Sequence, residues 1–150
     1  MRHTIIILFF LSVSIFATAQ SGNWNDGVSV LKPGVRVMTC ANGYRLLPFL
    51  DLESHKIGFL RNSTNLNVAI PPLYEDGFYD VYLLMPVKKD GKWGAMDLGA
   101  RFYRKGYGFR DPIVPCIYDK VEVIDDLHLR VYKGDTSRVI DVSDGVDGVY

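Results

Sequence analysis

The chain has 150 residues, of which 48% are hydrophobic and 23% charged, with 17 basic and 17 acidic side chains. This is the composition of an ordinary globular domain and argues against a disordered chain, a collagen-like repeat or a two-domain enzyme. The balanced charge gives no overall field to attract nucleic acid or an anionic membrane. Two cysteines are too few for a disulfide-rich scaffold or a four-thiolate zinc site.

The first 19 residues have the order of a secretory signal peptide. Positive charge at Met1-Arg2-His3 is followed by an apolar run, residues 5–16, and then by small residues at the cleavage spacing, residues 17–19. The apolar run is shorter than the ~20 residues that span a bilayer, which argues against an anchor. We predict that residues 1–19 are removed and that residues 20–150 form a single exported domain, periplasmic or extracellular, with no membrane span.

Cys40 and Cys116 both belong to the predicted mature chain. An oxidising compartment would allow them to pair, and closing a loop of this length would add about 4 kcal/mol of stability if the geometry permits. The alternative is two small buried thiols, because sequence does not give the Cβ separation that a disulfide requires.

The mature chain reads as short strands separated by turns. No window has the apolar spacing and caps of a helix, so we predict no substantial helix after the signal peptide. Pairs such as Asn42-Gly43 and Asp90-Gly91 are typical of tight hairpin turns. The fold class is therefore all-β, built from antiparallel hairpins. The predicted strands cover residues 35–39, 44–49, 78–87 (alternating around Val81, Leu83 and Met85), 93–98, 120–124, 127–132 and 138–142.

A weak internal repeat organises these strands. Residues 71–75 (Pro-Pro-Leu-Tyr-Glu) recur 44 positions later as residues 115–119 (Pro-Cys-Ile-Tyr-Asp). Residues 91–97 recur in degraded form at 135–141, and an earlier copy lies at 55–60. A period of roughly 40 residues in a β-rich chain indicates an array of small sheet units, here about three degenerate repeats.

One unit of the repeat, residues 91–119, carries a recognisable motif. It reads Gly-Lys-Trp-Gly, then an aliphatic residue and Asp97, and later a proline before Tyr118-Asp119. This motif resembles the WG repeat, also called the KWG repeat, of bacterial proteins, and the resemblance covers about residues 46–145. Such proteins are β-rich, often exported and generally without assigned chemistry. The resemblance therefore implies an interaction or structural module rather than an enzyme.

The motif also has a physical interpretation as scaffold. A glycine on either side of the Lys-Trp pair permits a tight turn and the close approach of a neighbouring strand to the indole, which favours Trp93 in the core. The tyrosine offers an aromatic body to the core, and the aspartate that follows it can close a turn. We predict structural roles for Gly91, Lys92, Trp93, Gly94, Asp97, Tyr118 and Asp119.

One stretch does not fit the repeat and defines the basic-aromatic segment, residues 101–110. From Asp97 to Pro115 the chain takes 18 residues, against 10 from Arg61 to Pro71, so this copy holds an insertion. Insertions in repeat arrays map to exposed loops, often on the binding face. The alternative is an ordinary hairpin with aromatics in the core and cations in water. The predicted partner-binding residues are Arg101, Phe102, Tyr103, Arg104, Lys105, Tyr107, Phe109 and Arg110.

Other candidate chemistry is thin. Residues 105–109 match the start of a ribonucleoprotein pattern, but Arg110 and Pro112 break it, and neutral charge and export argue further against nucleic acid. His55 and His128 share no metal-ligand spacing, and residues 141–148 lack the order of a calcium loop. No serine is flanked by nucleophile-elbow glycines. We predict no catalytic residue, no metal and no cofactor.

These observations favour an exported, non-catalytic module. It would bind another macromolecule, an unknown protein or glycan, through the basic-aromatic segment. Open edge strands also allow self-association. The alternative is a small β-barrel enzyme or ligand carrier, whose cavity would hold His55 or His128.

Overall fold

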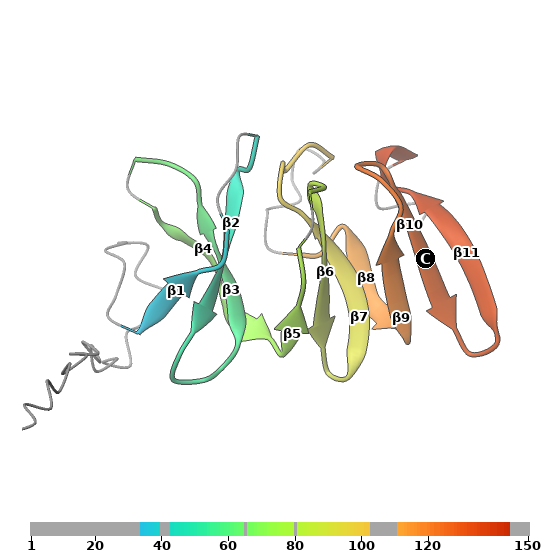
Figure 1. The fold of residues 1–150 in the computed structure, drawn as a ribbon, viewed down its shortest axis with the longest axis horizontal. Coiled ribbons are helices and arrows are strands. Elements are labelled where there is room, and N and C mark those ends of the chain that lie inside the picture. The colour runs from blue at the N-terminus through green and yellow to red at the C-terminus, as the bar shows by residue number, and fades with distance from the viewer. Residues whose placement is uncertain (1–33, 40–42, 65, 80, 103–110, 145–150) are drawn as a thin grey trace, which may run out of the picture.

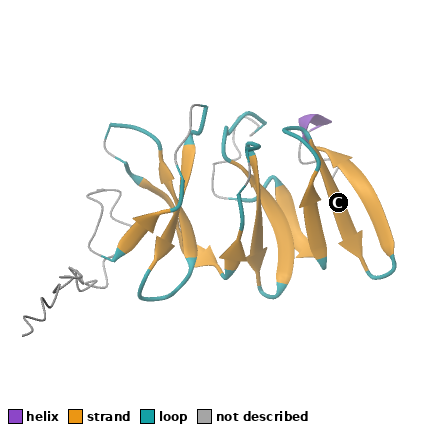
Figure 2. Ribbon diagram, in the orientation of Figure 1, coloured by secondary structure: helices purple, strands orange, loops and turns teal. Residues whose placement is uncertain are grey.

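The computed structural model describes residues 34–39, 43–64, 66–79, 81–102 and 111–144. Within these ranges the chain forms antiparallel strands and one turn of 3-10 helix, η1 (Val142–Asp144), with no α-helix (Figure 2). The prediction of an all-β fold made of hairpin repeats is confirmed. The predicted signal peptide lies outside the described residues. In the described part of the chain no helix is long and apolar enough to cross a membrane.

The strands form three sheets side by side along the long axis of the molecule, which we call units 1, 2 and 3 (Figure 1). Strands adjacent in each sheet are also adjacent in the chain. Unit 1 contains β1 (Val35–Val37), β2 (Leu46–Asp51), β3 (Ile57–Arg61) and β4 (Val68–Tyr74). Unit 2 contains β5 (Asp76–Gly77), β6 (Leu84–Lys89), β7 (Lys92–Asp97) and β8 (Val114–Tyr118). Unit 3 contains β9 (Lys120–Val123), β10 (His128–Lys133) and β11 (Thr136–Asp141).

The units repeat one plan. The fourth strand of a unit leads into the first strand of the next through a single residue, Glu75 between β4 and β5 and Asp119 between β8 and β9. That acidic residue closes the next hairpin: Glu75 accepts hydrogen bonds from the amides of Asp90 and Gly91 (2.9 and 3.3 Å), and Asp119 accepts one from Gly134 (2.8 Å). The turn at Asp90-Gly91 has φ of 52° and 75°, the left-handed conformation that a tight hairpin turn requires.

The fourth strands β4 and β8 are not among the strands predicted from sequence, because a bulge interrupts the alternation of side chains in each of them. In both, three residues bulge opposite one glycine of the third strand: Ile57 pairs with Tyr74 and Phe59 with Ile70, with Gly58 between. Pro71, Pro72 and Pro115 lie in these bulges, where the missing amide of a proline does not interrupt the ladder. Strand β3 is also missing from the predicted strands, although residues 55–60 were identified from the sequence as a copy of the repeat.

The bulge explains the glycine of the Trp-Gly pair. A Cβ placed on Gly94 would lie 2.3 Å from the carbonyl oxygen of Val114, and one on Gly58 would lie 2.8 Å from that of Ile70. Both obstacles are backbone atoms and cannot rotate away. Glycine is therefore required where the fourth strand crosses the third.

Two further predictions need correction. Residues 78–87 were predicted as one strand, but β6 begins only at Leu84, and Val81 is 83% exposed whereas Met85 is fully buried. The reason is that the preceding chain turns toward unit 3, where the Leu83 amide donates to Asp126. Asn42 lies outside the described residues, and the pairing of Val37 with Phe49 leaves too many residues between β1 and β2 for the predicted tight hairpin turn.

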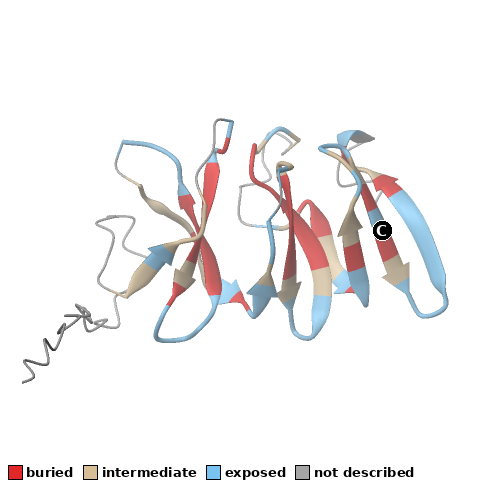
Figure 3. Cartoon of the chain, viewed as in Figure 1, coloured by how far each residue is buried: buried red, intermediate tan, exposed pale blue. Residues whose placement is uncertain are grey.

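The hydrophobic core lies between the units, and the central unit is buried on both faces (Figure 3). Because side chains alternate along a strand, Met85 and Val87 of β6 pack against unit 1 while Leu84 packs against unit 3. Tyr74, at the end of β4, lies in the first of these interfaces, 5.7 Å edge-to-face from Phe59. Tyr118, at the end of β8, lies in the second.

Candidate interaction surface

The basic-aromatic segment leaves unit 2 from a buried carboxylate. Asp97, the last residue of β7, is fully buried and accepts hydrogen bonds from three backbone amides, those of Gly99, Arg101 and Phe102, at 3.1, 2.6 and 3.3 Å. When one carboxylate accepts hydrogen bonds from several amides that follow it in sequence, the chain there is held in a compact turn. The first residues of the segment are therefore held rigidly at the end of β7.

Arg101 continues this anchor and joins units 2 and 3. Its Nε lies 3.1 Å from Oδ1 of Asp97, and its terminal nitrogen donates to the carbonyl of Asp126 at 2.6 Å. The guanidinium also lies over the ring of Phe102, 4.9 Å from the ring centre. With its side chain only 26% exposed, Arg101 is held against the fold.

Apolar residues that pack in or against the core hold both sides of the segment. Phe102 packs against the core between units 2 and 3. Beyond it the chain is described again from Asp111, and Ile113 and Val114 are fully buried in the same core. The remaining residues predicted to bind a partner lie outside the described residues: Tyr103, Arg104, Lys105, Tyr107, Phe109 and Arg110.

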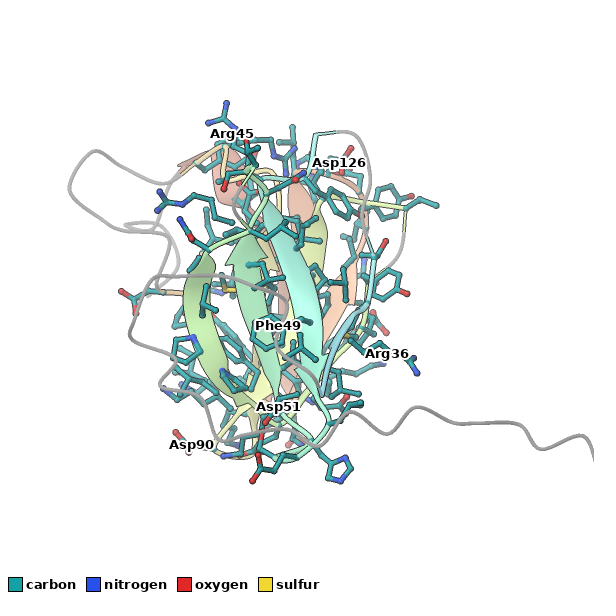
Figure 4. All side chains as sticks on the ribbon, turned by 90° about the vertical axis from the view of Figure 1, so that its left-hand side faces the viewer. Arg36, Arg45, Phe49, Asp51, Asp90 and Asp126 are labelled. Atoms are coloured by element: carbon teal, nitrogen blue, oxygen red, sulfur yellow. The ribbon has the colours of Figure 1, made fainter. Side chains whose placement is uncertain are left out.

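The base of the basic-aromatic segment lies at the end of the stack opposite the tight hairpin turns. Figure 4 shows Arg45 and Asp126 at one end of the sheets and Asp51 and Asp90 at the other. Because Arg101 binds the carbonyl of Asp126, the base of the segment lies at the first of these ends. The tight turns and their acidic caps occupy the second.

The Lys-Trp pair lies near the hairpin end of unit 2. Lys92 forms an ion pair with Asp119 at 2.5 Å, and this hydrogen bond is the main cause that lowers the Asp119 pKa. Trp93 is half-buried: it packs on the core between units 2 and 3, edge-to-face with Phe78 at 5.7 Å, and Lys88 lies 5.8 Å from the indole. Its indole is therefore less enclosed than the sequence prediction of a core Trp assumed.

Cys116 is half-buried on β8, with its Sγ 3.7 Å from the carbonyl of Val87. Burial raises its pKa to about 11, so the thiol is neutral at physiological pH and a poor nucleophile. Cys40 lies outside the described residues, and the pairing of the two cysteines stays a prediction.

His128 lies between two carboxylates. Its Nδ1 is 2.9 Å from Oδ1 of Asp125, and its Nε2 is 3.6 Å from Oδ2 of Asp141. The amide of Leu127 is the main cause that lowers the Asp125 pKa, and the hydroxyl of Ser143 is the main cause that lowers the Asp141 pKa. Sequence reasoning noticed Asp125 but missed Asp141, which faces His128 across the β10–β11 pairing. The internal repeat could have predicted this contact. Leu84 and Asp97, which lie 44 positions before His128 and Asp141, are paired in the same way in unit 2.

Among the described residues no cluster of three or more His, Cys, Asp or Glu side chains is arranged to hold a metal ion. A groove of about 280 Å³ lies beside β11, lined by Ile117, Tyr118, Val131, Lys133, Thr136, Ser137 and Arg138. The lining includes the apolar side chains of Ile117 and Val131 and the cations of Lys133 and Arg138, and Arg138 donates a hydrogen bond to the hydroxyl of Tyr118.

Comparison with known proteins adds no relative: no protein-family model, no curated protein and no solved structure matches the chain.

Proposed function

We propose that the chain is an exported, non-catalytic interaction module of the WG-repeat type, which binds another macromolecule, a protein or a glycan, through the basic-aromatic segment. The observation that carries the proposal is the anchoring of this segment at both ends. Asp97 and Arg101 hold its start at the junction of units 2 and 3, and Ile113 and Val114 hold the chain beyond it in the core. Export would place the module in the periplasm or outside the cell.

Anchored ends favour binding because they reduce the conformational entropy that a loop loses when it engages a partner. The composition of the segment fits such a role, since it holds four cations, four aromatic residues and no acidic residue in ten positions. Aromatic faces stack on sugar rings and on apolar side chains, and guanidinium groups pair with carboxylates. Arg101 serves as the anchor, which leaves Arg104, Lys105 and Arg110 as the cations for a partner.

The test is affinity capture from the envelope and medium of the native organism, with bound species identified by mass spectrometry. The test variant replaces Arg104, Lys105 and Arg110 with Ser and keeps Arg101. A matched control removes the same number of exposed cations elsewhere, with R36S, K56S and K89S.

A partner retained by the wild type and the control but lost by the test variant supports the proposal. Retention by all three proteins, or the absence of any specific partner, contradicts it. Thermal unfolding of each variant, checked by far-UV circular dichroism, separates lost binding from lost structure.

A further inference from the structure

Phe78, Lys88 and Trp93 form a surface cluster at the junction of units 2 and 3, which we call the Trp93 cluster. The rings of Phe78 and Trp93 lie 5.7 Å apart, edge to face at 60°. The ammonium of Lys88 lies 5.8 Å from the centre of the indole. Phe78 is 46% exposed, and the other two residues are half-buried. Two aromatic rings and a cation therefore each keep part of their surface in contact with solvent.

Comparison with unit 1 indicates that the fold does not require this cluster. Ile57 and Trp93 both pair with the tyrosine that ends the fourth strand, and on their other side they pair with Leu50 and Lys88. The same alignment relates Phe78 to a methionine, whose amide also donates to a proline of the second strand. The three residues of unit 1 pack in or against the core. Unit 2 thus places two aromatic rings and a charge where apolar packing alone would serve.

Lys88 differs from the neighbouring lysines in having no carboxylate partner. Lys92 forms an ion pair with Asp119, and Lys120 forms one with Glu122. Lys88 forms none with any residue that the structure describes, and its ammonium lies over the indole instead. A negative group brought beside this cation would gain a charge-assisted hydrogen bond. The cluster therefore complements a ligand that carries a carboxylate.

We propose that the Trp93 cluster binds a uronic acid residue of an acidic glycan. The C–H groups on the face of the sugar ring pack on Phe78 and Trp93, and the sugar carboxylate pairs with Lys88. Asp76 lies opposite Lys88 on β5, and its carboxylate accepts the amide of Gly77 at 2.8 Å. The same carboxylate can accept a hydrogen bond from a sugar hydroxyl. The site thus matches a ligand that is apolar on one face and anionic at its rim.

A protein partner fits the cluster less well. An extended peptide docks along the open edge of a sheet, and the edge strand beside the cluster, β5, has only two residues. A folded protein uses about 20–30 residues on each side of a stable interface, whereas a single sugar ring is comparable in size to an aromatic side chain. The cluster lies toward the hairpin end of unit 2, away from the base of the basic-aromatic segment. It is therefore a second site, independent of the proposed function.

Tryptophan fluorescence tests the assignment directly. The chain has two tryptophans, so the W24F background leaves Trp93 as the single reporter. The probe is tetragalacturonate, and its methyl ester serves as the matched uncharged ligand. We expect the acid to change the emission of Trp93 with a Kd of about 1 mM, since the contact area is small. The ester should bind about tenfold more weakly.

Variants in the same background identify the groups that bind. K88M removes the charge and keeps the apolar stem, and K89M is its matched control, because Lys89 points to the opposite face of β6. We expect K88M to weaken binding of tetragalacturonate by about tenfold, F78A to weaken it by about fivefold, and K89M to leave it unchanged. Far-UV circular dichroism checks that each variant is folded.

Three results overturn the proposal: no change in emission up to about 20 mM acid, equal affinity for the acid and the ester, or equal affinity in K88M and K89M. The variant R104S, K105S and R110S separates this site from the proposed function. It should bind tetragalacturonate as the background does. Loss of binding in that variant would assign the glycan to the basic-aromatic segment and contradict a site at Trp93.

Discussion

Units 2 and 3 share one strand plan but use different side chains for it. Every position from Leu84 to Val87 in β6 is buried, because unit 2 packs against neighbours on both faces, whereas in β10 buried and exposed positions alternate. The third strand is buried in unit 2 and mostly exposed in unit 3. Position in the stack, and not membership of the repeat, therefore determines which residues a unit needs. Among the described residues unit 3 packs on one face only, which accounts for the decay of the repeat there.

The largest difference is expected at the aspartate that ends the third strand. Asp97 is fully buried beneath three amides and Arg101, whereas Asp141 is half-exposed. D97A leaves the Nε of Arg101 and three backbone amides without their acceptor in a buried site, so we expect a loss of about 4 kcal/mol. D141A should cost less than about 1 kcal/mol. Urea denaturation of both variants measures the difference, and equal losses would show that burial does not distinguish the two sites.

The next largest effect is expected at the glycine of the Trp-Gly pair. G94A places a Cβ against the backbone of β8, so the fourth strand must shift, at a cost of about 3 kcal/mol. The equivalent change R138A removes one hydrogen bond to Tyr118 and should cost no more than about 1.5 kcal/mol. A well-tolerated G94A would mean that β8 does not cross β7 as closely as described.

Trp93 should have a smaller effect than a core tryptophan. It is half-buried against Phe78 and the second core, so W93A should cost about 2 kcal/mol, below the 3–5 kcal/mol typical of a core position. S137A, at the equivalent exposed position of unit 3, should change stability by less than about 0.5 kcal/mol. Circular dichroism is the appropriate probe, since the change removes a fluorophore. A loss of 0.5 kcal/mol or less for W93A would mean that the indole is not part of the packing.

The smallest effect is a pH dependence confined to unit 3. The pKa values of Asp125 and Asp141 are lowered in the folded state, so each carboxylate contributes stability above its unfolded pKa of about 3.9 and loses it as the pH falls through the folded value. The variant D125N, D141N should therefore be less stable than the wild type at pH 7, with the gap narrowing below about pH 4. A gap that stays constant from pH 7 to pH 3 would show that these charges do not stabilise the fold.

Local pattern in the sequence was enough to predict the hairpins of units 2 and 3, and it failed where tertiary contacts decide. An Asp-Gly pair strongly favours a tight hairpin turn, so Asp90-Gly91 was enough to predict the turn between β6 and β7. The fourth strands β4 and β8 were hidden, because a bulge interrupts the alternation of side chains in each of them, and that bulge depends on a glycine in the neighbouring third strand. The exposed Val81 was read as part of an alternating strand, since the contact of Leu83 with Asp126 has no local signal.

The candidate surface shows the same division. Composition and the length of the insertion pointed to the basic-aromatic segment, and both are properties of sequence. The role of Arg101 was not predictable, because its partners are a buried carboxylate and a carbonyl of the next unit. Arg101, which was predicted to bind a partner, therefore anchors the segment to the fold instead.

Unit 1 offers the most direct test of the central claim, because its chain from the end of the third strand to the proline of the fourth, Arg61 to Pro71, is eight residues shorter than Asp97 to Pro115 in unit 2. Residues 103–110 are excised from unit 2 and the ends are joined through Gly-Asn-Gly, and the product is compared with the wild type in thermal unfolding and partner capture. The account predicts unchanged unfolding and complete loss of the captured partner. Capture that survives the excision would contradict it, and a collapse of thermal stability would assign the segment to the scaffold.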